Sequence, residues 1–240
     1  MSPATEPQQR GPRFYGRRKG RPLRAAQERR LATLLPRLAV VLPPEGGRRA
    51  PPALFPFPVS DVWLEIGFGA GEHLVAQAAA HPHVGFIGCE IFRNGIAALL
   101  RLVETRGLDN LRIFPDDARL LMPALPEAGI GRCFVLFPDP WPKARHAARR
   151  FIGPANLDEL ARLLKDGAEL RVASDDAGHV AWVMEQVSAH PAFDAPPPVL
   201  ERPADWPPTR YEAKAIAAGR RPHYFTFRRR GRRESGPDFA

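Results

Sequence analysis

A regular alternation of short apolar runs and helix-compatible segments begins near residue 60 and restricts the possible folds more than any other feature. Val62–Ile66 is an apolar run that ends in the glycine-rich turn GFGAG, and Glu72–Ala80 is compatible with a helix. Strands that alternate with helices are typical of a parallel sheet covered by helices. We therefore expect an α/β fold: a Rossmann-like, doubly wound, mostly parallel seven-stranded sheet with helices on both faces.

The other elements follow from the same pattern of apolar periodicity and Gly/Pro boundaries. The expected strands cover residues 62–66, 84–91, 111–115, 132–137, 169–173, 197–201 and 223–229, and the expected helices 72–80, 94–106, 119–125, 154–165 and 178–189. A short helix is expected within 25–39, whereas recurring prolines make 42–58 irregular. The predicted organisation is a basic, largely irregular arm (1–55), one domain (56–230) and a basic, polar tail (231–240).

The net charge of +9 is concentrated at the two ends of the chain. Residues 1–30 carry a net +7 and residues 228–240 a net +3, so the rest sums to −1. We expect the polar residues 1–24 to form a mobile arm. Two cationic ends on a near-neutral domain favour a polyanionic partner such as RNA. The alternative is that both ends are solvated basic tails without a specific partner.

Several classes of protein are disfavoured by the sequence. Its apolar stretches are too short and interrupted to span a bilayer, and its first residues lack the apolar region of a secretory signal. Cys89 and Cys133 both lie in apolar runs, which indicates a reducing cytoplasm rather than a disulfide framework. The histidines and cysteines lack the spacing of known metal sites. We expect a cytoplasmic protein without a metal or a membrane partner.

The turn after the first strand predicts a nucleoside-like cofactor. Glu65 precedes Gly67, Gly69 and Gly71, and this G-x-G-x-G spacing differs from the G-x-G-x-x-G of dinucleotide-binding turns. A pyrophosphate would be repelled by Glu65. S-adenosylmethionine has no phosphate, and its ammonium and sulfonium groups are cationic. The turn therefore favours S-adenosylmethionine over NAD, although an NAD-dependent oxidoreductase on the same kind of sheet stays an alternative.

Two further acidic positions follow the next two strands. Glu90 ends the second strand, where a carboxylate accepts hydrogen bonds from the hydroxyls of a ribose. Asp117 and Ala118 follow the third strand, where a side chain can meet an adenine amino group. Carboxyl ends of parallel strands share one edge of the sheet, so these groups are expected to line one crevice. Acidic residues at strand ends can also be simple helix caps.

A proline-rich loop after the fourth strand carries the candidate substrate residues. In PDPWPK, prolines restrict the backbone around Asp139 and Trp141. A carboxylate can accept hydrogen bonds from the N1–H and amino group of guanine. A cationic stretch follows at Lys143, Arg145, Arg149 and Arg150, which suits phosphates. A stiffened turn followed by a solvated cationic helix face is the alternative.

Five blocks together carry a specific resemblance. They are LEIGFGAGEHL (64–74), GCEIFRNGI (88–96), FPDPWPKARHAARRF (137–151), SDD (174–176) and TRYE (209–212). Over roughly residues 60–228 the chain resembles the bacterial tRNA (guanine-N7-)-methyltransferase family. The resemblance implies a methyltransferase domain over 56–230 that transfers a methyl group from S-adenosylmethionine to N7 of a tRNA guanine. The expected target is the variable-loop guanine, position 46 in tRNA numbering.

The resemblance also implies roles for individual residues. The implied cofactor contacts are Glu65, Gly67, Gly69, Gly71, Glu90, Asp117, Ala118 and Asp139, with Asp139 also the catalytic carboxylate. The implied substrate contacts are Lys143, Asp175, Thr209, Arg210, Tyr211 and Glu212, and the implied RNA contacts are Arg145, His146, Arg149 and Arg150. A monomer or homodimer without an obligate second subunit is expected. A methyltransferase of another RNA, and an RNA-binding module with a vestigial pocket, stay open as alternatives.

Overall fold

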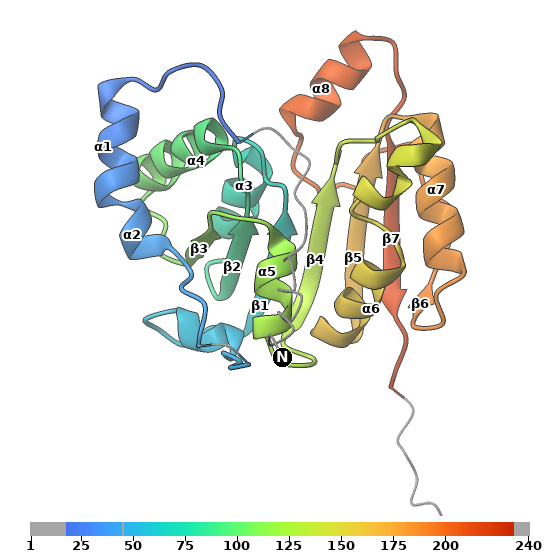
Figure 1. Ribbon diagram of the computed structural model, residues 1–240, viewed down its shortest axis with the longest axis horizontal. Coiled ribbons are helices and arrows are strands. Elements are labelled where there is room, and N and C mark those ends of the chain that lie inside the picture. Colours follow the sequence, from blue (N-terminus) through green and yellow to red (C-terminus); the bar gives the residue numbers. More distant parts are fainter. Residues whose placement is uncertain (1–17, 45, 233–240) are drawn as a thin grey trace, which may run out of the picture.

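The computed structural model describes residues 18–44 and 46–232 and is built around one seven-stranded sheet (Figure 1). The strand order is β3-β2-β1-β4-β5-β7-β6. The strands are β1 (Asp61–Ile66), β2 (Val84–Cys89), β3 (Leu111–Phe114), β4 (Ile130–Leu136), β5 (Leu164–Ser174), β6 (Phe193–Asp194) and β7 (His223–Arg229). Strands β1 to β5 pair in parallel, and β7 is antiparallel to β5 and β6. The expected α/β fold is confirmed.

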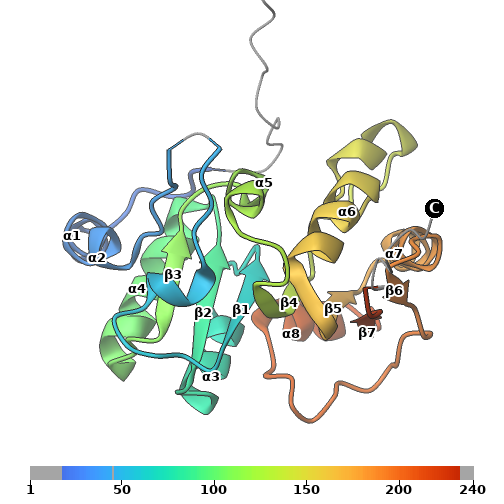
Figure 2. The same cartoon turned by 90° about the horizontal axis from the view of Figure 1, so that it is seen from below.

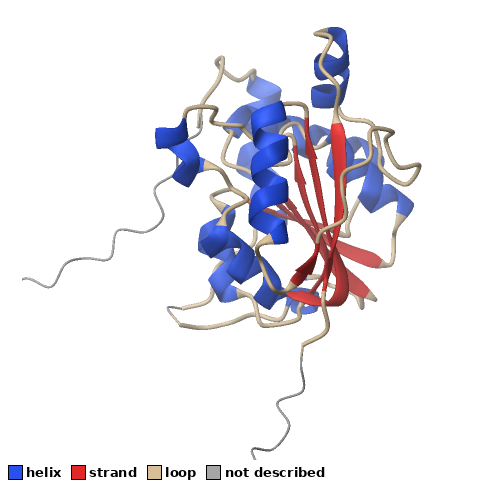
Figure 3. Ribbon diagram, turned by 90° about the vertical axis from the view of Figure 1, so that its right-hand side faces the viewer, coloured by secondary structure: helices blue, strands red, loops and turns tan. Residues whose placement is uncertain are grey.

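Helices cover both faces of the sheet (Figures 2 and 3). The α-helices are α1 (Ala25–Thr33), α2 (Leu35–Leu38), α3 (Glu72–Ala80), α4 (Arg93–Arg106), α5 (Ala118–Leu121), α6 (Pro154–Leu163), α7 (Ala177–Ser188) and α8 (Arg210–Ala217); the 3-10 turns are η1 (Pro51–Leu54), η2 (Met122–Ala124) and η3 (Ala144–Arg149). Alternate residues of β1 point to opposite faces, so Trp63 packs with α3 and α4 while Val62 and Leu64 share a core with α6 and α7. The two cores fix the strand ends that carry the site.

In the C-terminal third, one predicted strand was wrong and one helix was not predicted. The strand expected at 197–201 is reduced to a single bridge between Val199 and Tyr224, because the preceding prolines cannot donate to a ladder. The edge strand is the two-residue β6 instead. Helix α8 was not expected, although the capping box in which Thr209 and Glu212 bond each other's backbone N–H is a sequence signal for a helix start.

Residues 18–24, expected within a mobile arm, lie along the start of α4. The Arg93 N–H donates to the Arg18 carbonyl at 3.0 Å, and the Gly20 N–H donates to Asn94 Oδ1 at 2.8 Å. The Asn94 amide in turn donates to the Arg21 carbonyl at 2.8 Å. This part of the arm is therefore docked on the domain, because backbone polar groups on both sides are satisfied by the contact. The rest of the predicted arm, residues 1–17, lies outside the described residues.

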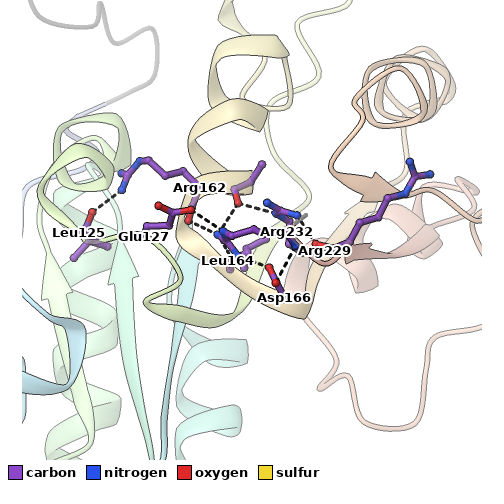
Figure 4. A network of polar contacts seen from close by, with 9 residues as sticks. Leu125, Glu127, Arg162, Leu164, Asp166, Arg229 and Arg232 are labelled. Carbon is purple, nitrogen blue, oxygen red and sulfur yellow. Dashed lines mark hydrogen bonds and ion pairs between the residues drawn. The ribbon is translucent and has the colours of Figure 1, made fainter. Parts of the chain in front are cut away.

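Arg232, which follows β7, is engaged within the protein (Figure 4), so this member of the basic C-terminal segment already has partners in the domain. The Arg232 guanidinium donates to the carbonyls of Arg162 and Leu164 at 2.8 and 2.9 Å, and it pairs with Glu127 at 2.7 Å and also with Asp166. These carbonyls lie where α6 passes into β5. The Arg232 side chain therefore adds charge-assisted hydrogen bonds to carbonyls at the C-terminal end of α6 and the start of β5.

We expect Arg232→Ala to lower the free energy of unfolding by about 2 kcal/mol, because charge-assisted hydrogen bonds to several half-buried carbonyls are lost. Arg228 provides the matched control: its side chain is 61% exposed and makes a single 3.3 Å pair with Glu169. Arg228→Ala is expected to change stability by less than about 0.5 kcal/mol. Urea unfolding of both variants measures the difference. Equal losses would show that the Arg232 contacts contribute nothing specific.

Candidate active site

A cavity of about 380 Å³ opens at the carboxyl ends of β1, β2 and β4. Gly67 and Gly69 line it from the first turn, Glu90 from the end of β2, and Asp139 from the loop after β4. It lies where the strand order reverses, between β1 and β4, since the chain runs outward to β3 on one side and to β5 on the other. Open α/β sheets bind ligands at this switch point.

The glycine turn requires its glycines for conformational reasons. Gly67, Gly69 and Gly71 have φ of 76°, 60° and 83°, in the left-handed region that residues with a Cβ rarely adopt. A Cβ on Gly69 would also lie 2.9 Å from the ring of Tyr211 on α8. The turn therefore presents bare backbone to the cavity, with an aromatic side chain lying directly against it.

Glu90 is fixed at the cavity wall by backbone donors. Its Oε2 accepts from the Gly69 N–H at 2.8 Å, and its Oε1 accepts from the N–H groups of Ile91 and Phe92 at 2.8 and 2.9 Å. Burial raises the pKa of this carboxyl group, while the three hydrogen bonds oppose the rise. A carboxylate has about four acceptor positions. The remaining acceptor position of Glu90 can accept a hydrogen bond from a hydroxyl group of a ligand.

Asp117 and Ala118 also line the cavity, as predicted for a position after β3. Asp117 caps α5 through the Arg119 N–H at 3.0 Å and pairs with the Arg119 guanidinium at 2.6 Å. The helix-cap alternative and the cavity-lining prediction therefore both hold for this residue. Ala118, the next residue, lines the same side of the cavity.

Glu65 lies behind the cavity, in a small adjoining space beside Gly67 and Tyr211. It is 3% exposed, and its Oε2 lies 2.7 Å from His73 Nδ1. His73 Nε2 in turn lies 3.4 Å from Gln77, whose amide donates to the Asp205 carbonyl at 3.2 Å. Sequence reasoning missed this buried polar chain. The sequence signal for it was the pair His73 and Gln77, two polar residues four apart on the apolar face of α3.

Asp139 stands exposed at the cavity mouth on a backbone with two unusual conformations. Phe137 and Trp141 have φ of 50° and 43°, which non-glycine residues adopt at an energetic cost. Such conformations persist where the surroundings impose them and are concentrated at functional sites. The two strained residues lie on either side of Asp139, the carboxylate predicted to be catalytic.

The cationic stretch of this loop divides into outward and inward side chains. Lys143 and Arg145 are exposed, and Arg149 and His146 pack around the Trp141 ring at 5.0 and 5.8 Å. Partial desolvation, followed by the neighbouring cations, lowers the pKa of His146. The cations Lys143, Arg145 and Arg149 form one basic surface beside the cavity mouth, and Arg149 also lines the cavity.

Arg150 differs from its predicted role as an RNA contact. Its guanidinium turns inward, donates to the carbonyls of Pro140 and Trp141, and lies over the ring of Trp182. The carbonyl oxygens and the face of the Trp182 ring carry negative potential, so they attract the half-buried guanidinium of Arg150. The side chain is therefore not presented to a phosphate.

The predicted substrate residues of α8 also divide. Tyr211 lines the cavity, and Arg210 lies over the Tyr211 ring and 3.8 Å from Glu72. Glu212 is 6% exposed and faces the core, where it accepts from the Tyr224 hydroxyl at 2.5 Å. Thr209 caps the helix and lines the small space around Glu65. Only part of this block faces the cavity.

Asp175 is not among the described residues that line the cavity, and Arg220 pairs with it at 2.6 Å. Arg220 lies just after α8, so the pair ties the turn after β5 to the chain that follows this helix. The contact of Asp175 with the substrate guanosine stays a prediction, and in this structure its carboxylate pairs with Arg220.

Behind the loop, His179 on α7 is fully buried and lies 3.1 Å from Ser174 Oγ. Desolvation, then the nearby Arg150, lowers its pKa from 6.5 to about 4. A histidine with a lowered pKa in the folded state stabilises the protein above pH 6.5, and this stability is lost as pH falls toward 4. We expect the loss to reach about 3 kcal/mol. His179→Gln should remove this part of the pH dependence, whereas the exposed His83→Gln should not.

Urea unfolding of wild type and both variants between pH 4 and 7 gives the free energy of unfolding as a function of pH. The difference between the wild-type and His179→Gln curves is the contribution of His179, because the carboxylates are the same in both proteins. Identical pH profiles for wild type and His179→Gln would contradict the assignment.

Comparison with known proteins decides the family. Residues 60–225 match a family model described as putative methyltransferase. A Rhodospirillum rubrum protein named tRNA (guanine-N(7)-)-methyltransferase is 59% identical over 226 residues, covering 92% of this chain and 89% of that protein. The chain belongs to the tRNA (guanine-N7-)-methyltransferase family. A second member, from Paramagnetospirillum magneticum, is 56% identical over 225 residues, covering 92% of this chain and 94% of that protein.

Solved structures similar to this member of the tRNA (guanine-N7-)-methyltransferase family agree on the fold. The 16S rRNA methyltransferase KamB matches with a TM-score of 0.54 and 17% identity, covering 72% of this chain and 89% of that one. TrmN from Thermus thermophilus matches with a TM-score of 0.52 and 14% identity, covering 74% and 46%. At these identities the likeness concerns the sheet and its helices alone. Across residues 18–44 and 46–232, no helix has the length and apolar character to cross a bilayer.

Proposed function

We propose that the protein transfers a methyl group from S-adenosylmethionine to N7 of a guanine in tRNA, and that the target is the variable-loop guanine at position 46. The observation that carries the proposal is the cavity at the switch point of a chain from this family. Its walls hold carboxylates of Glu90, Asp117 and Asp139 above a left-handed glycine turn. The proposed catalytic unit is the domain over 56–230, between a basic arm and a basic tail.

The residues present fit S-adenosylmethionine. Glu90 would accept from a ribose hydroxyl, and Asp117 and Ala118 would meet the adenine. The glycine turn, with Glu65 in the space behind it, would face the amino-acid end. Acidic walls suit a cationic sulfonium and disfavour a pyrophosphate. When bound, S-adenosylmethionine supplies an electrophilic methyl group.

Guanine N7 carries an in-plane lone pair and no proton, so the protein need not supply a general base. Its work is to hold N7 in line with the methyl donor, which lowers the barrier by several kcal/mol. The imidazole ring of the base becomes cationic on methylation, so the Asp139 carboxylate at the cavity mouth would stabilise the charge that develops. Asp139 would also orient the guanine edge.

Of the other site residues, some would contact the guanosine and others the RNA backbone. Tyr211, Arg210 and Lys143 would hold the guanosine from α8 and the loop, with Thr209 supporting the start of α8. Arg145, Arg149 and His146 would meet phosphates on the basic surface beside the mouth. Asp175 and Glu212 would act indirectly, by fixing the chain on either side of α8. The protein would act in the cytoplasm as a monomer or homodimer without an obligate second subunit.

The test uses S-adenosylmethionine labelled on its methyl group, with unmodified tRNA and with rRNA as separate substrates. The proposal expects label in tRNA only, and thermal stabilisation of the protein by S-adenosylhomocysteine but not by NADH. A tRNA in which the position-46 guanine is replaced should lose the label. Label in rRNA alone would favour another RNA substrate, and stabilisation by NADH alone would favour the oxidoreductase.

A further inference from the structure

We infer that Arg150 is a positioning residue for the methyl-transfer reaction, which holds the backbone of the Asp139 loop in its active conformation. The inference rests on the proposed function, in which Asp139 faces the substrate base. It assigns to Arg150 a role in turnover rather than in RNA affinity.

The hydrogen bonds of Arg150 join it to the two residues after Asp139. Its Nε donates to the Pro140 carbonyl at 3.1 Å and to the Trp141 carbonyl at 3.3 Å, and a terminal nitrogen donates to the Trp141 carbonyl at 3.1 Å. Both carbonyls belong to the strained stretch between the left-handed residues Phe137 and Trp141. A conformation of this kind needs support from its surroundings.

The other side of Arg150 is anchored to the domain. Its guanidinium carbon lies 4.6 Å from the centroid of the Trp182 ring on α7. The Trp182 ring is itself fixed, because its Nε1–H donates to the Ile152 carbonyl at 2.5 Å. The guanidinium is therefore held between a helix of the domain and the loop that carries Asp139. A shift of the guanidinium would move the loop.

The chemistry of the contact requires arginine. A planar guanidinium reaches two carbonyls and stacks on an indole at the same time, whereas an ammonium is a compact point charge. Lys in place of Arg150 would keep the positive charge but lose the planar set of N–H donors. A phosphate contact would tolerate this exchange far better than a backbone support. Charge and shape can therefore be separated by one substitution.

The experiment compares Arg150→Lys with Arg145→Ala, since Arg145 is an exposed cation of the same loop. Measured quantities are single-turnover rate at saturating tRNA, KM for tRNA, the salt dependence of tRNA binding, and S-adenosylhomocysteine affinity. Arg150→Lys is expected to lower the rate by about 10²-fold, the scale of a 1 Å misplacement, with KM and salt slope unchanged. Arg145→Ala is expected to raise KM and reduce the salt slope by about one.

Unchanged S-adenosylhomocysteine affinity in Arg150→Lys shows that the domain is folded. Should that affinity fall, guanidinium added to Arg150→Ala provides the second measurement, and recovery of rate supports the inference while failure to recover overturns it. A normal rate in Arg150→Lys also overturns it, as does a salt slope reduced like that of Arg145→Ala. Absence of methyl transfer by the wild type would instead refute the proposed function.

Discussion

Asp139→Asn is expected to lower the single-turnover rate of methyl transfer by about 10²- to 10³-fold, the range found when one preorganised electrostatic group is removed. The substitution keeps the shape of the side chain and removes its charge. Because the base becomes cationic during the reaction, the lost interaction is stronger in the transition state than in the bound substrate. Affinity for S-adenosylhomocysteine should change by less than about threefold, since less than 1 kcal/mol is at stake there.

The matched control for this variant is Asp158→Asn on α6, whose carboxylate is 75% exposed and pairs with His190. It removes the same charge from a place outside the cavity lining and should leave rate and affinity as in the wild type. Titration of S-adenosylhomocysteine and rapid-quench kinetics with excess enzyme separate the two quantities. Intact turnover in Asp139→Asn would remove this residue from the mechanism.

Gly95→Ala is expected to weaken cofactor binding by about tenfold or more and to destabilise the fold by about 1–3 kcal/mol. Helix α4 approaches the glycine turn so closely that a Cβ on Gly95 would lie 2.1 Å from the Gly69 carbonyl oxygen. Backbone cannot rotate away as a long side chain can, so the turn and the helix must separate. Since Gly69 donates to Glu90, the separation would disturb the wall of the cavity as well.

The sign of the stability change is informative, because Gly95 lies in the first turn of α4, where helix propensity alone favours alanine over glycine. Gly231→Ala is the control, since a Cβ there meets nothing within 4 Å. Urea unfolding and calorimetric titration of S-adenosylhomocysteine measure stability and affinity. Gly95→Ala with wild-type or higher stability and unchanged affinity would show that the close approach is not required.

The sequence was sufficient for the five parallel strands and the glycine turn, because these depend on short-range patterns. Val62–Ile66, the three turn glycines and Glu90 were all located from apolar runs, glycine spacing and strand ends. The same local logic found α4, which ends at Gly107 with φ of 64°. Where the residues that decide a structure are neighbours in sequence, the prediction held.

Predictions that depended on side-chain direction were less successful. Arg150 and Arg149 are adjacent and chemically identical, yet one supports the loop and the other packs on Trp141 beside the mouth. Glu212 was assigned to the substrate, but Tyr224, 12 residues later, holds it in the core. Arg232 was counted as phosphate-binding charge, but carbonyls about 70 residues earlier in the chain occupy it. Partners this distant are set by the tertiary fold.

Methyl transfer to guanine N7 can be measured by nucleoside mass spectrometry of one unmodified tRNA transcript, incubated with the purified protein and S-adenosylmethionine. We expect one new nucleoside, 7-methylguanosine, formed in proportion to the S-adenosylhomocysteine released and absent when the protein is omitted. Methylation at a different atom or base, or an unmodified transcript in the presence of protein that binds S-adenosylhomocysteine, would contradict it.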